Sequence, residues 1–133
     1  TLMGQPTHAV AFEDIARAMG IQHVRTVDSY NIKAVEAALR EALEAGGPAV
    51  IVARRECALL PEARRHWQAL SVNVERCNGC GLCFQVGCPA LVKSEQVDEK
   101  SGRPQARIDP LLCTGCGICA QVCARKAIVK REA

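Results

Sequence analysis

The stretch that decides the fold reads Cys77-Asn78-Gly79-Cys80-Gly81-Leu82-Cys83-Phe84-Gln85-Val86-Gly87-Cys88. It returns further along the chain as Cys113-Thr114-Gly115-Cys116-Gly117-Ile118-Cys119-Ala120-Gln121-Val122-Cys123. Both copies contain Cys-x-Gly-Cys-Gly-x-Cys followed by Gln-Val, and the first copy has one extra residue, Gly87, before its fourth cysteine. Duplication of a short unit predicts a single core in which the two copies are related by a two-fold-like arrangement.

These eight cysteines favour two [4Fe–4S] clusters. Such a cluster takes four thiolates, and three cysteines spaced by two residues can wrap one loop around three of its corners. The glycines between the cysteines allow the tight turns that this requires. In two-cluster ferredoxins the fourth cysteine of each run binds the other cluster. The predicted ligand sets are therefore Cys77, Cys80, Cys83 and Cys123 for one cluster, and Cys113, Cys116, Cys119 and Cys88 for the other.

Other uses of the cysteines are less favoured. Zinc sites contain Cys-x-x-Cys pairs, but neither a third cysteine at the same spacing nor its repetition is expected of them. A disulfide framework needs an oxidising compartment and a secretory signal, and neither is indicated. The ninth cysteine, Cys57, is predicted to be a small apolar residue after a buried strand. No metal-ligand spacing relates the histidines, so surface or core roles are expected for His8, His23 and His66.

Two details depart from the usual ferredoxin spacing. Gly87 is available to absorb the extra residue of the first run as a bulge, and Ala124 stands where a proline usually follows the last cysteine. Proline there ligates nothing, so only a slight change of geometry is expected. The 24 residues between Cys88 and Cys113 contain a polar, turn-rich stretch, 98–104, that predicts an exposed hairpin.

The first half of the chain has the pattern of alternating helices and strands. A first helix is predicted from Phe12 to Met19 and is ended by Gly20. A second helix is predicted to start at a cap, Asp28, Ser29 or Asn31, and to continue to about Ala45. Strands are predicted at 23–27 and 49–53. The apolar run 49–53 is typical of a strand buried on both faces. The buried helix positions are expected to be Phe12, Ile15, Ala16 and Met19 in the first helix, and Ile32, Val35, Leu39, Ala42 and Leu43 in the second.

This order implies a parallel sheet with crossover helices. Two strands and two helices cannot cover such a sheet on both faces, which indicates the tail of a larger α/β domain. Between residues 56 and 70 the pattern weakens, with one helical turn expected within 61–67. The expected fold is therefore a partial α/β domain over residues 1–66, followed by a small α+β domain of the bacterial 2[4Fe–4S] ferredoxin type over 67–133.

Composition excludes several classes of function. Hydrophobic residues make up 49% and charged residues 23%, the balance of a globular protein. The formal net charge is only +3, and the one dense basic patch has no interleaved aromatics, which argues against nucleic-acid binding; it comprises Arg54, Arg55, Arg64 and Arg65. No apolar run is long enough for a membrane span, and no secretory signal is visible. A cytoplasmic location is therefore expected.

Three segments of the first half, 12–21, 27–30 and 47–57, resemble the end of a thiamine diphosphate-binding domain. Because two ferredoxin-type cysteine runs follow directly, the order resembles the large subunit of indolepyruvate:ferredoxin oxidoreductases. That family oxidatively decarboxylates aryl pyruvates with coenzyme A and passes the electrons to external ferredoxin, with thiamine diphosphate supplying the carbanion chemistry. The resemblance implies as partners the remainder of the large subunit and a small beta subunit.

The residues expected to hold thiamine diphosphate and Mg²⁺ are missing. The family uses a Gly-Asp-Gly motif followed downstream by an Asn, and this combination does not appear in the chain. Met3-Gly4-Gln5-Pro6 either resembles the loop just after that Asn or is a plain loop. The chain begins with Thr1 rather than Met, which indicates a processed, truncated or partial protein. It is expected to be the electron-transfer end of the enzyme without catalytic residues of its own; the alternative is a stand-alone ferredoxin-like carrier with an α/β docking region.

Overall fold

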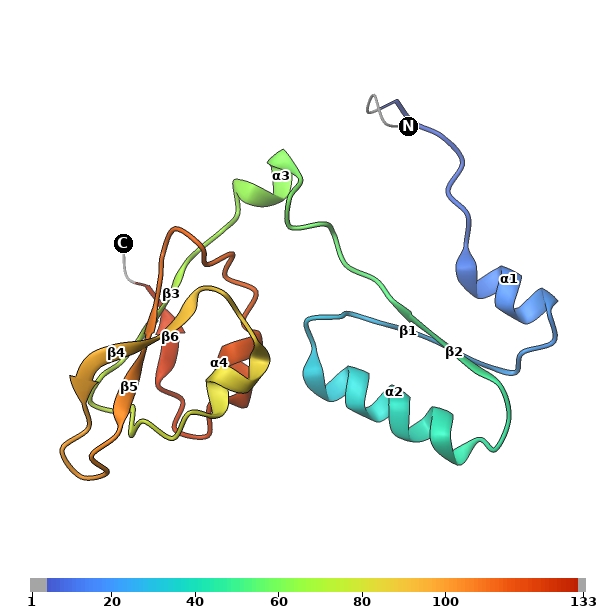
Figure 1. Ribbon diagram of the computed structural model, residues 1–133. Coiled ribbons are helices and arrows are strands. Elements are labelled where there is room, and N and C mark those ends of the chain that lie inside the picture. Colours follow the sequence, from blue (N-terminus) through green and yellow to red (C-terminus); the bar gives the residue numbers. More distant parts are fainter. Residues whose placement is uncertain (1–4, 132–133) are drawn as a thin grey trace. The chain divides into compact units, whose positions relative to one another are not determined.

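The structure is a computed structural model that describes residues 5–131 and divides between Arg55 and Glu56 into two compact units (Figure 1). The first unit contains α1 (Phe12–Ala18), β1 (His23–Val27), α2 (Ile32–Glu44) and β2 (Ala49–Ala53). The second contains α3 (Pro61–Arg64), β3 (Leu70–Val72), the 3-10 helix η1 (Leu82–Val86), β4 (Leu91–Val97), β5 (Pro104–Ile108), α4 (Ile118–Val122) and β6 (Ile128–Lys130). Met3 and Gly4, part of the predicted loop 3–6, lie outside the described residues.

In the first unit β1 and β2 pair in parallel, and α2 forms the crossover between them (Figure 1). The register runs from His23 opposite Ala49 to Val27 opposite Ala53. Of the three candidate caps, Asn31 is the one that starts α2, because its side-chain oxygen accepts a hydrogen bond from the Ala34 N–H at 3.1 Å. The predicted strand–helix–strand order and the parallel pairing are confirmed.

The predicted burial of this unit is partly wrong. Among residues 5–55, only the small side chains of Ala16 on α1 and Ala38 on α2 are buried, whereas Leu39 and Leu43 are 50% and 82% exposed. On α1, the side chains of Phe12, Ile15 and Met19 are likewise exposed. Strand β2, predicted to be buried on both faces, is half-buried with an exposed last residue. The physical reason is that the sheet is narrow. Among the described residues it has two strands, which cover only Ala16 on α1 and Ala38 on α2.

The second unit shows the predicted two-fold-like arrangement of the repeat (Figure 1). Each copy runs from a strand through its cysteine loop and a short helix to a second strand: β3, η1 and β4, then β5, α4 and β6. Both pairings are antiparallel and join the two copies, because β3 and β4 of the first copy pair with β6 and β5 of the second. The β4–β5 hairpin confirms the hairpin predicted around residues 98–104.

The core of the second unit lies between these strands and the two short helices. Buried residues from both copies form one cluster: Leu70, Cys83, Ala90, Leu91, Ala106, Ile108, Cys119 and Ile128. Ala90 and Ala127, which follow the fourth cysteine of each run, are each 1% exposed. Since Cys83 and Cys119 belong to the same cluster, the two cysteine runs share one apolar core.

Candidate metal centres

The cysteine loops place equivalent residues in equivalent positions. Gly81 and Gly117 have φ angles of 81° and 79°, and the helices η1 and α4 begin directly after them. The third cysteine of each run, Cys83 or Cys119, therefore lies on the helix and is buried in the core. Gly87 ends η1 with φ 68°, which accommodates the extra residue of the first run as predicted.

Four of the predicted ligands surround one cavity. Cys77, Cys80 and Cys83 of the first run line it together with Cys123 of the second run. The remaining wall contains apolar side chains, among them Val72, Phe84 and Ile128. Because β6 follows Cys123 and pairs with β3, the strand exchange between copies brings Cys123 across to the first loop. The structure thus brings together the residues of the first predicted set.

The pKa shifts of the two buried thiols, Cys83 and Cys119, show which cysteines lie near each of them. Burial raises the pKa of the Cys83 thiol, and the neighbouring thiols of Cys123, Cys77 and Cys80 raise that pKa further. Burial also raises the pKa of Cys119, to about 11, with further contributions from Cys116, Cys113 and Cys88. A thiolate is costly in such surroundings unless positive charge compensates it. The neighbours of each buried thiol are the other three members of its predicted set.

These surroundings fit a cluster better than a single ion. Among residues 5–131, no three His, Cys, Asp or Glu side chains converge closely enough to hold one metal ion. A zinc site would need such convergence, since its Zn–S bonds are about 2.3 Å long. A [4Fe–4S] cube instead holds one thiolate at each of four separate corners. Two backbone N–H groups also point at cysteine sulfurs: Leu70 donates to Cys113 Sγ at 3.4 Å, and Ala127 donates to Cys123 Sγ at 3.3 Å.

The β4–β5 hairpin braces the first cysteine loop. Gln105 is the buried polar residue of the described chain, and its Nε2 donates to the carbonyl oxygens of Val74 at 2.7 Å and Cys77 at 2.6 Å. The Ser101 hydroxyl donates to the carbonyl oxygen of Asn78 at 2.8 Å. Three carbonyls in and beside this loop are thereby satisfied by side chains of the insertion. Sequence reasoning missed this role, because a polar residue in a polar hairpin carries no local signal of burial.

Gly79 and Gly115 must be glycines, because other segments of the chain approach them closely. A Cβ on Gly79 would lie 2.8 Å from Arg103 Cβ and 2.9 Å from the carbonyl oxygen of Pro104. A Cβ on Gly115 would overlap the backbone of Gln68. Both residues also have positive φ, 66° and 72°. Each cysteine loop is thus packed against a neighbouring segment with no room for a side chain.

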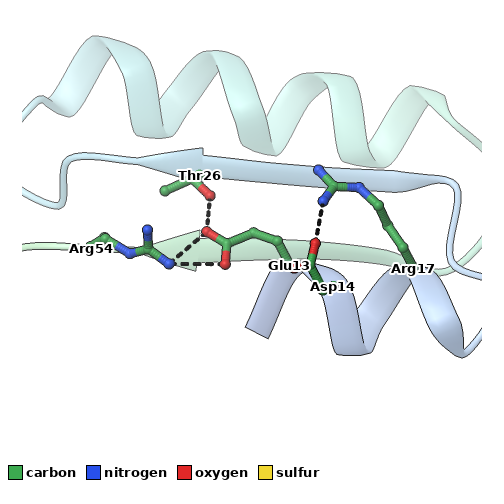
Figure 2. A network of polar contacts seen from close by, with 5 residues as sticks. All are labelled: Glu13, Asp14, Arg17, Thr26 and Arg54. Carbon is green, nitrogen blue, oxygen red and sulfur yellow. Dashed lines mark hydrogen bonds and ion pairs between the residues drawn. The ribbon is translucent and has the colours of Figure 1, made fainter. Parts of the chain in front are cut away.

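In the first unit, Glu13 ties α1 to β1 and to Arg54, the residue that follows β2 (Figure 2). Its carboxylate accepts hydrogen bonds from the Thr26 hydroxyl and from Arg54 Nη2, the latter at 2.7 Å. The Thr26 hydrogen bond is the largest cause that lowers the pKa of Glu13, and Arg54 lowers it further. Asp14 pairs separately with Arg17 on the helix surface.

This polar network lies towards the carboxyl ends of the parallel strands, where ligands bind in many α/β folds. Its carboxylates are already paired, however: Glu13 with Arg54, and Asp28 with Arg55, whose guanidinium also stacks over Tyr30 at 4.6 Å. The described residues of this unit therefore do not fit a Mg²⁺–diphosphate site. That agrees with the absence of Gly-Asp-Gly from the sequence.

The remaining candidate residues lie at the surface. Cys57 is exposed, so its predicted apolar role is wrong. It follows the end of β2 and starts a turn, in which its carbonyl accepts from the Leu60 N–H, so no strand buries it. The three histidines, His8, His23 and His66, are exposed as well. No helix among the described residues is long and apolar enough to cross a membrane.

Comparison with known proteins tests the resemblance. Residues 76–127 match the family model of a 4Fe–4S dicluster domain, and residues 1–53 match the C-terminal TPP binding domain of thiamine pyrophosphate enzymes. The chain is 40% identical over 131 residues to the indolepyruvate oxidoreductase subunit IorA of Pyrococcus horikoshii, covering 94% of this chain. It is similar to IorA subunits over nearly its whole length. The IorA subunits of Thermococcus kodakarensis and Methanothermobacter marburgensis are each 38% identical to it, over 90% and 95% of this chain.

The chain spans 19% of the length of each of these IorA relatives. The dicluster match confirms the prediction of two [4Fe–4S] clusters, and the thiamine match confirms the assignment of the first half. The predicted ligand sets are not tested by these matches. The cavity and the neighbours of the buried thiols described above support them.

Proposed function

We propose that this chain is the electron-transfer end of an oxidoreductase that oxidatively decarboxylates aryl pyruvates such as indolepyruvate. Electrons from the decarboxylation pass through two [4Fe–4S] clusters to an external ferredoxin. The observation that carries the proposal is the cavity lined by Cys77, Cys80, Cys83 and Cys123, formed by both copies of a repeat in a chain that also matches a thiamine enzyme domain.

In this proposal the first cluster is held by Cys77, Cys80, Cys83 and Cys123, and the second by Cys113, Cys116, Cys119 and Cys88. Each cluster supplies one-electron chemistry, so a two-electron oxidation is divided into single steps. Four closely spaced thiolates repel one another, and backbone donors reduce this electrostatic cost. The N–H groups of Leu70 and Ala127 donate to the sulfurs of Cys113 and Cys123. The shared core holds the two sets beside each other, which suits transfer between them.

The complete enzyme would contain further parts. Thiamine diphosphate and Mg²⁺ would be held mainly by residues outside this chain, since Glu13 and Asp28, the carboxylates near the carboxyl ends of the strands, are paired with arginines. A small beta subunit, the 2-oxoacid and coenzyme A complete the proposed assembly. We place it in the cytoplasm, because eight thiolate ligands require a reducing compartment.

Paired substitutions test the crossed ligand sets. In the complete enzyme, Cys83→Ser and Cys123→Ser should each remove the same cluster and leave the same EPR signal, while Cys119→Ser and Cys88→Ser should remove the other. Iron should fall from about eight per chain to about four in each case. Cys57→Ser is the matched control and should keep all the iron. Loss of different signals by Cys83→Ser and Cys123→Ser would contradict the crossed assignment.

A second experiment tests the reaction itself. Indolepyruvate with coenzyme A should reduce the clusters of the complete assembly under anaerobic conditions, and omission of thiamine diphosphate should abolish the reduction. If a reduced carrier protein reduces the clusters but no 2-oxoacid does so in any assembly, the chain is an electron carrier rather than part of this enzyme.

A further inference from the structure

We propose that electrons leave the protein through the first cysteine set, at a basic surface that docks an acidic one-electron carrier protein. This surface, the arginine face, consists of Arg76, Arg103 and Arg125. The inference rests on the proposed function and adds to it the exit site and the charge of the partner. Each transfer moves one electron from a reduced cluster to the oxidised carrier, with no bond formed or broken.

The three arginines border the first cysteine loop from three segments of the chain. Arg125 lines the cavity together with the four thiols of the first set. Arg103 is packed against the loop at Gly79, where a Cβ would lie 2.8 Å from Arg103 Cβ. Arg76 precedes Cys77 directly. These three arginines therefore lie beside one cysteine set, whereas Lys93, Arg107 and Arg131 of the same unit line a different cavity.

These guanidinium groups are available to a partner. All three arginines are exposed, and none of them forms an ion pair with a carboxylate of the described residues. The arginines of the first unit differ in this respect, since Arg54 and Arg55 are paired with Glu13 and Asp28. Because these charges are exposed and unpaired, no ion pair has to be broken when they approach an acidic surface.

The neighbouring charges leave the face basic. Glu75 precedes Arg76, and Asp98 and Glu99 lie in the hairpin turn. The Asp98 carboxylate accepts a hydrogen bond from the Ser101 N–H at 2.8 Å within that turn. Lys100 and Lys126 add further positive charge to the same segments.

The first cysteine set is also the one that a partner can approach. Cys80 is exposed at the loop, whereas all four cysteines of the second set are half-buried or buried. Leu82, in the same loop, is 42% exposed. An apolar contact beside the cluster with a charged rim is the usual composition of a small, transient protein interface.

The second cysteine run has the more exposed apolar side chains. Neither 77–92 nor 110–122 contains a charged residue, but Leu111 and Leu112, just before Cys113, are 87% and 53% exposed, whereas Leu82 of the first run is 42% exposed. An uncharged, apolar segment cannot steer a charged carrier, but it suits lasting contact with other parts of the enzyme. Electrons would therefore enter at the set containing Cys119 and leave from the set containing Cys83.

The test compares charge-reversal variants in the complete enzyme. The clusters are reduced with dithionite, excess reductant is removed, and the second-order rate of electron transfer to an acidic 2[4Fe–4S] ferredoxin is measured by stopped flow. The combined variant Arg76→Glu, Arg103→Glu and Arg125→Glu should lower this rate by about tenfold or more at low salt and flatten its dependence on ionic strength. The matched control is the combined variant Lys93→Glu, Arg107→Glu and Arg131→Glu, which reverses the same number of charges at a different cavity and should change the rate by less than about twofold.

Two further measurements separate docking from damage. Methyl viologen is a small cation and does not bind to a basic surface, so its reduction should not be slowed in the combined variant. Iron content should equal that of the parent enzyme; if a glutamate variant loses iron, the corresponding Arg→Gln variants replace it, with an expected decrease of about threefold in the ferredoxin rate.

The outcomes distinguish this inference from the proposed function. An unchanged ferredoxin rate and salt dependence in iron-replete variants would overturn the docking site, while leaving the enzyme assignment intact. An equal decrease in the control variant would also overturn it, because the rate would then depend on the net charge of the protein and not on the position of the charges. If the parent enzyme lacks about eight irons per chain, the proposed function fails, and the docking inference fails with it.

Discussion

Replacing Gly115 by alanine should destabilise the second unit more than replacing Gly117, although both glycines lie in the same cysteine loop. Both have positive φ, 72° and 79°, so alanine is strained at either position. The surroundings differ: a Cβ on Gly115 would overlap the Gln68 backbone, whereas a Cβ on Gly117 would have no atom within 4 Å. The comparison therefore separates steric overlap from backbone strain.

The magnitude follows from these two terms. Left-handed backbone costs an L-residue about 1–2 kcal/mol, and this cost is common to Gly115→Ala and Gly117→Ala. Forcing a methyl group into a filled site adds about 1–3 kcal/mol, and only Gly115→Ala incurs it. In a domain of 60–100 residues, about 1 kcal/mol shifts the melting temperature by roughly 4–8 °C. Gly115→Ala should therefore melt at least about 4 °C below Gly117→Ala.

The assay is anaerobic thermal bleaching of the cluster absorbance, at one scan rate because loss of the clusters is irreversible. A second matched pair lies in the first loop. Gly79→Ala meets Arg103 and Pro104 at 2.8–2.9 Å, whereas Gly81→Ala meets only Phe84 Cδ2, at 3.8 Å. The same order of melting temperatures is expected there. Equal midpoints within both pairs would refute the argument from close approach.

Three further substitutions test the bracing contacts. Gln105→Met should leave the carbonyls of Val74 and Cys77 unsatisfied, destabilise the second unit by about 2–4 kcal/mol and speed the release of iron to a chelator; the exposed Gln96→Met should do neither. Glu13→Gln should increase hydrogen exchange of the amides that join β1 and β2. Because the pKa of Glu13 is lowered in the folded protein, its ionised form stabilises the fold above about pH 4.5, and the difference from Glu13→Gln should shrink as the pH falls below that value; a constant difference would contradict the ionic role. Asn31→Ala should cost about 1 kcal/mol at the start of α2, visible as faster exchange in its first turn, and unchanged exchange there would show that the cap is dispensable.

Much of the local structure could be predicted from the sequence, because it is determined by neighbouring residues. Strands β1 and β2 have the predicted bounds, 23–27 and 49–53, and α1 and α2 end within one residue of the predicted ends. Apolar periodicity, the Asn31 cap and Gly20 are signals that act within a turn or two of the chain. The spacing of the cysteines likewise indicated clusters before any fold was known, because thiolate chemistry requires it.

Burial could not be predicted in the same way. Leu39 and Leu43 have the periodicity of a buried face, yet they are exposed, because the described sheet has two strands and covers only Ala38. Periodicity reports which side of a helix is apolar and not how much of that side a neighbour covers. Gln105 is the opposite case: the sequence makes no prediction for it, and its polar side chain is buried because two carbonyls of another segment accept its hydrogen bonds.

The sequence by itself determined that the chain carries two copies of a cluster-binding unit after an α/β segment. Only the tertiary structure decided how the two copies combine. Strands β3 and β6 are three residues long, too short to leave a pattern, yet their pairing brings Cys123 to the cavity of the first loop. It also leaves Arg125 at the rim of that cavity. Pairings between distant segments depend on the whole packed core, so no local signal encodes them.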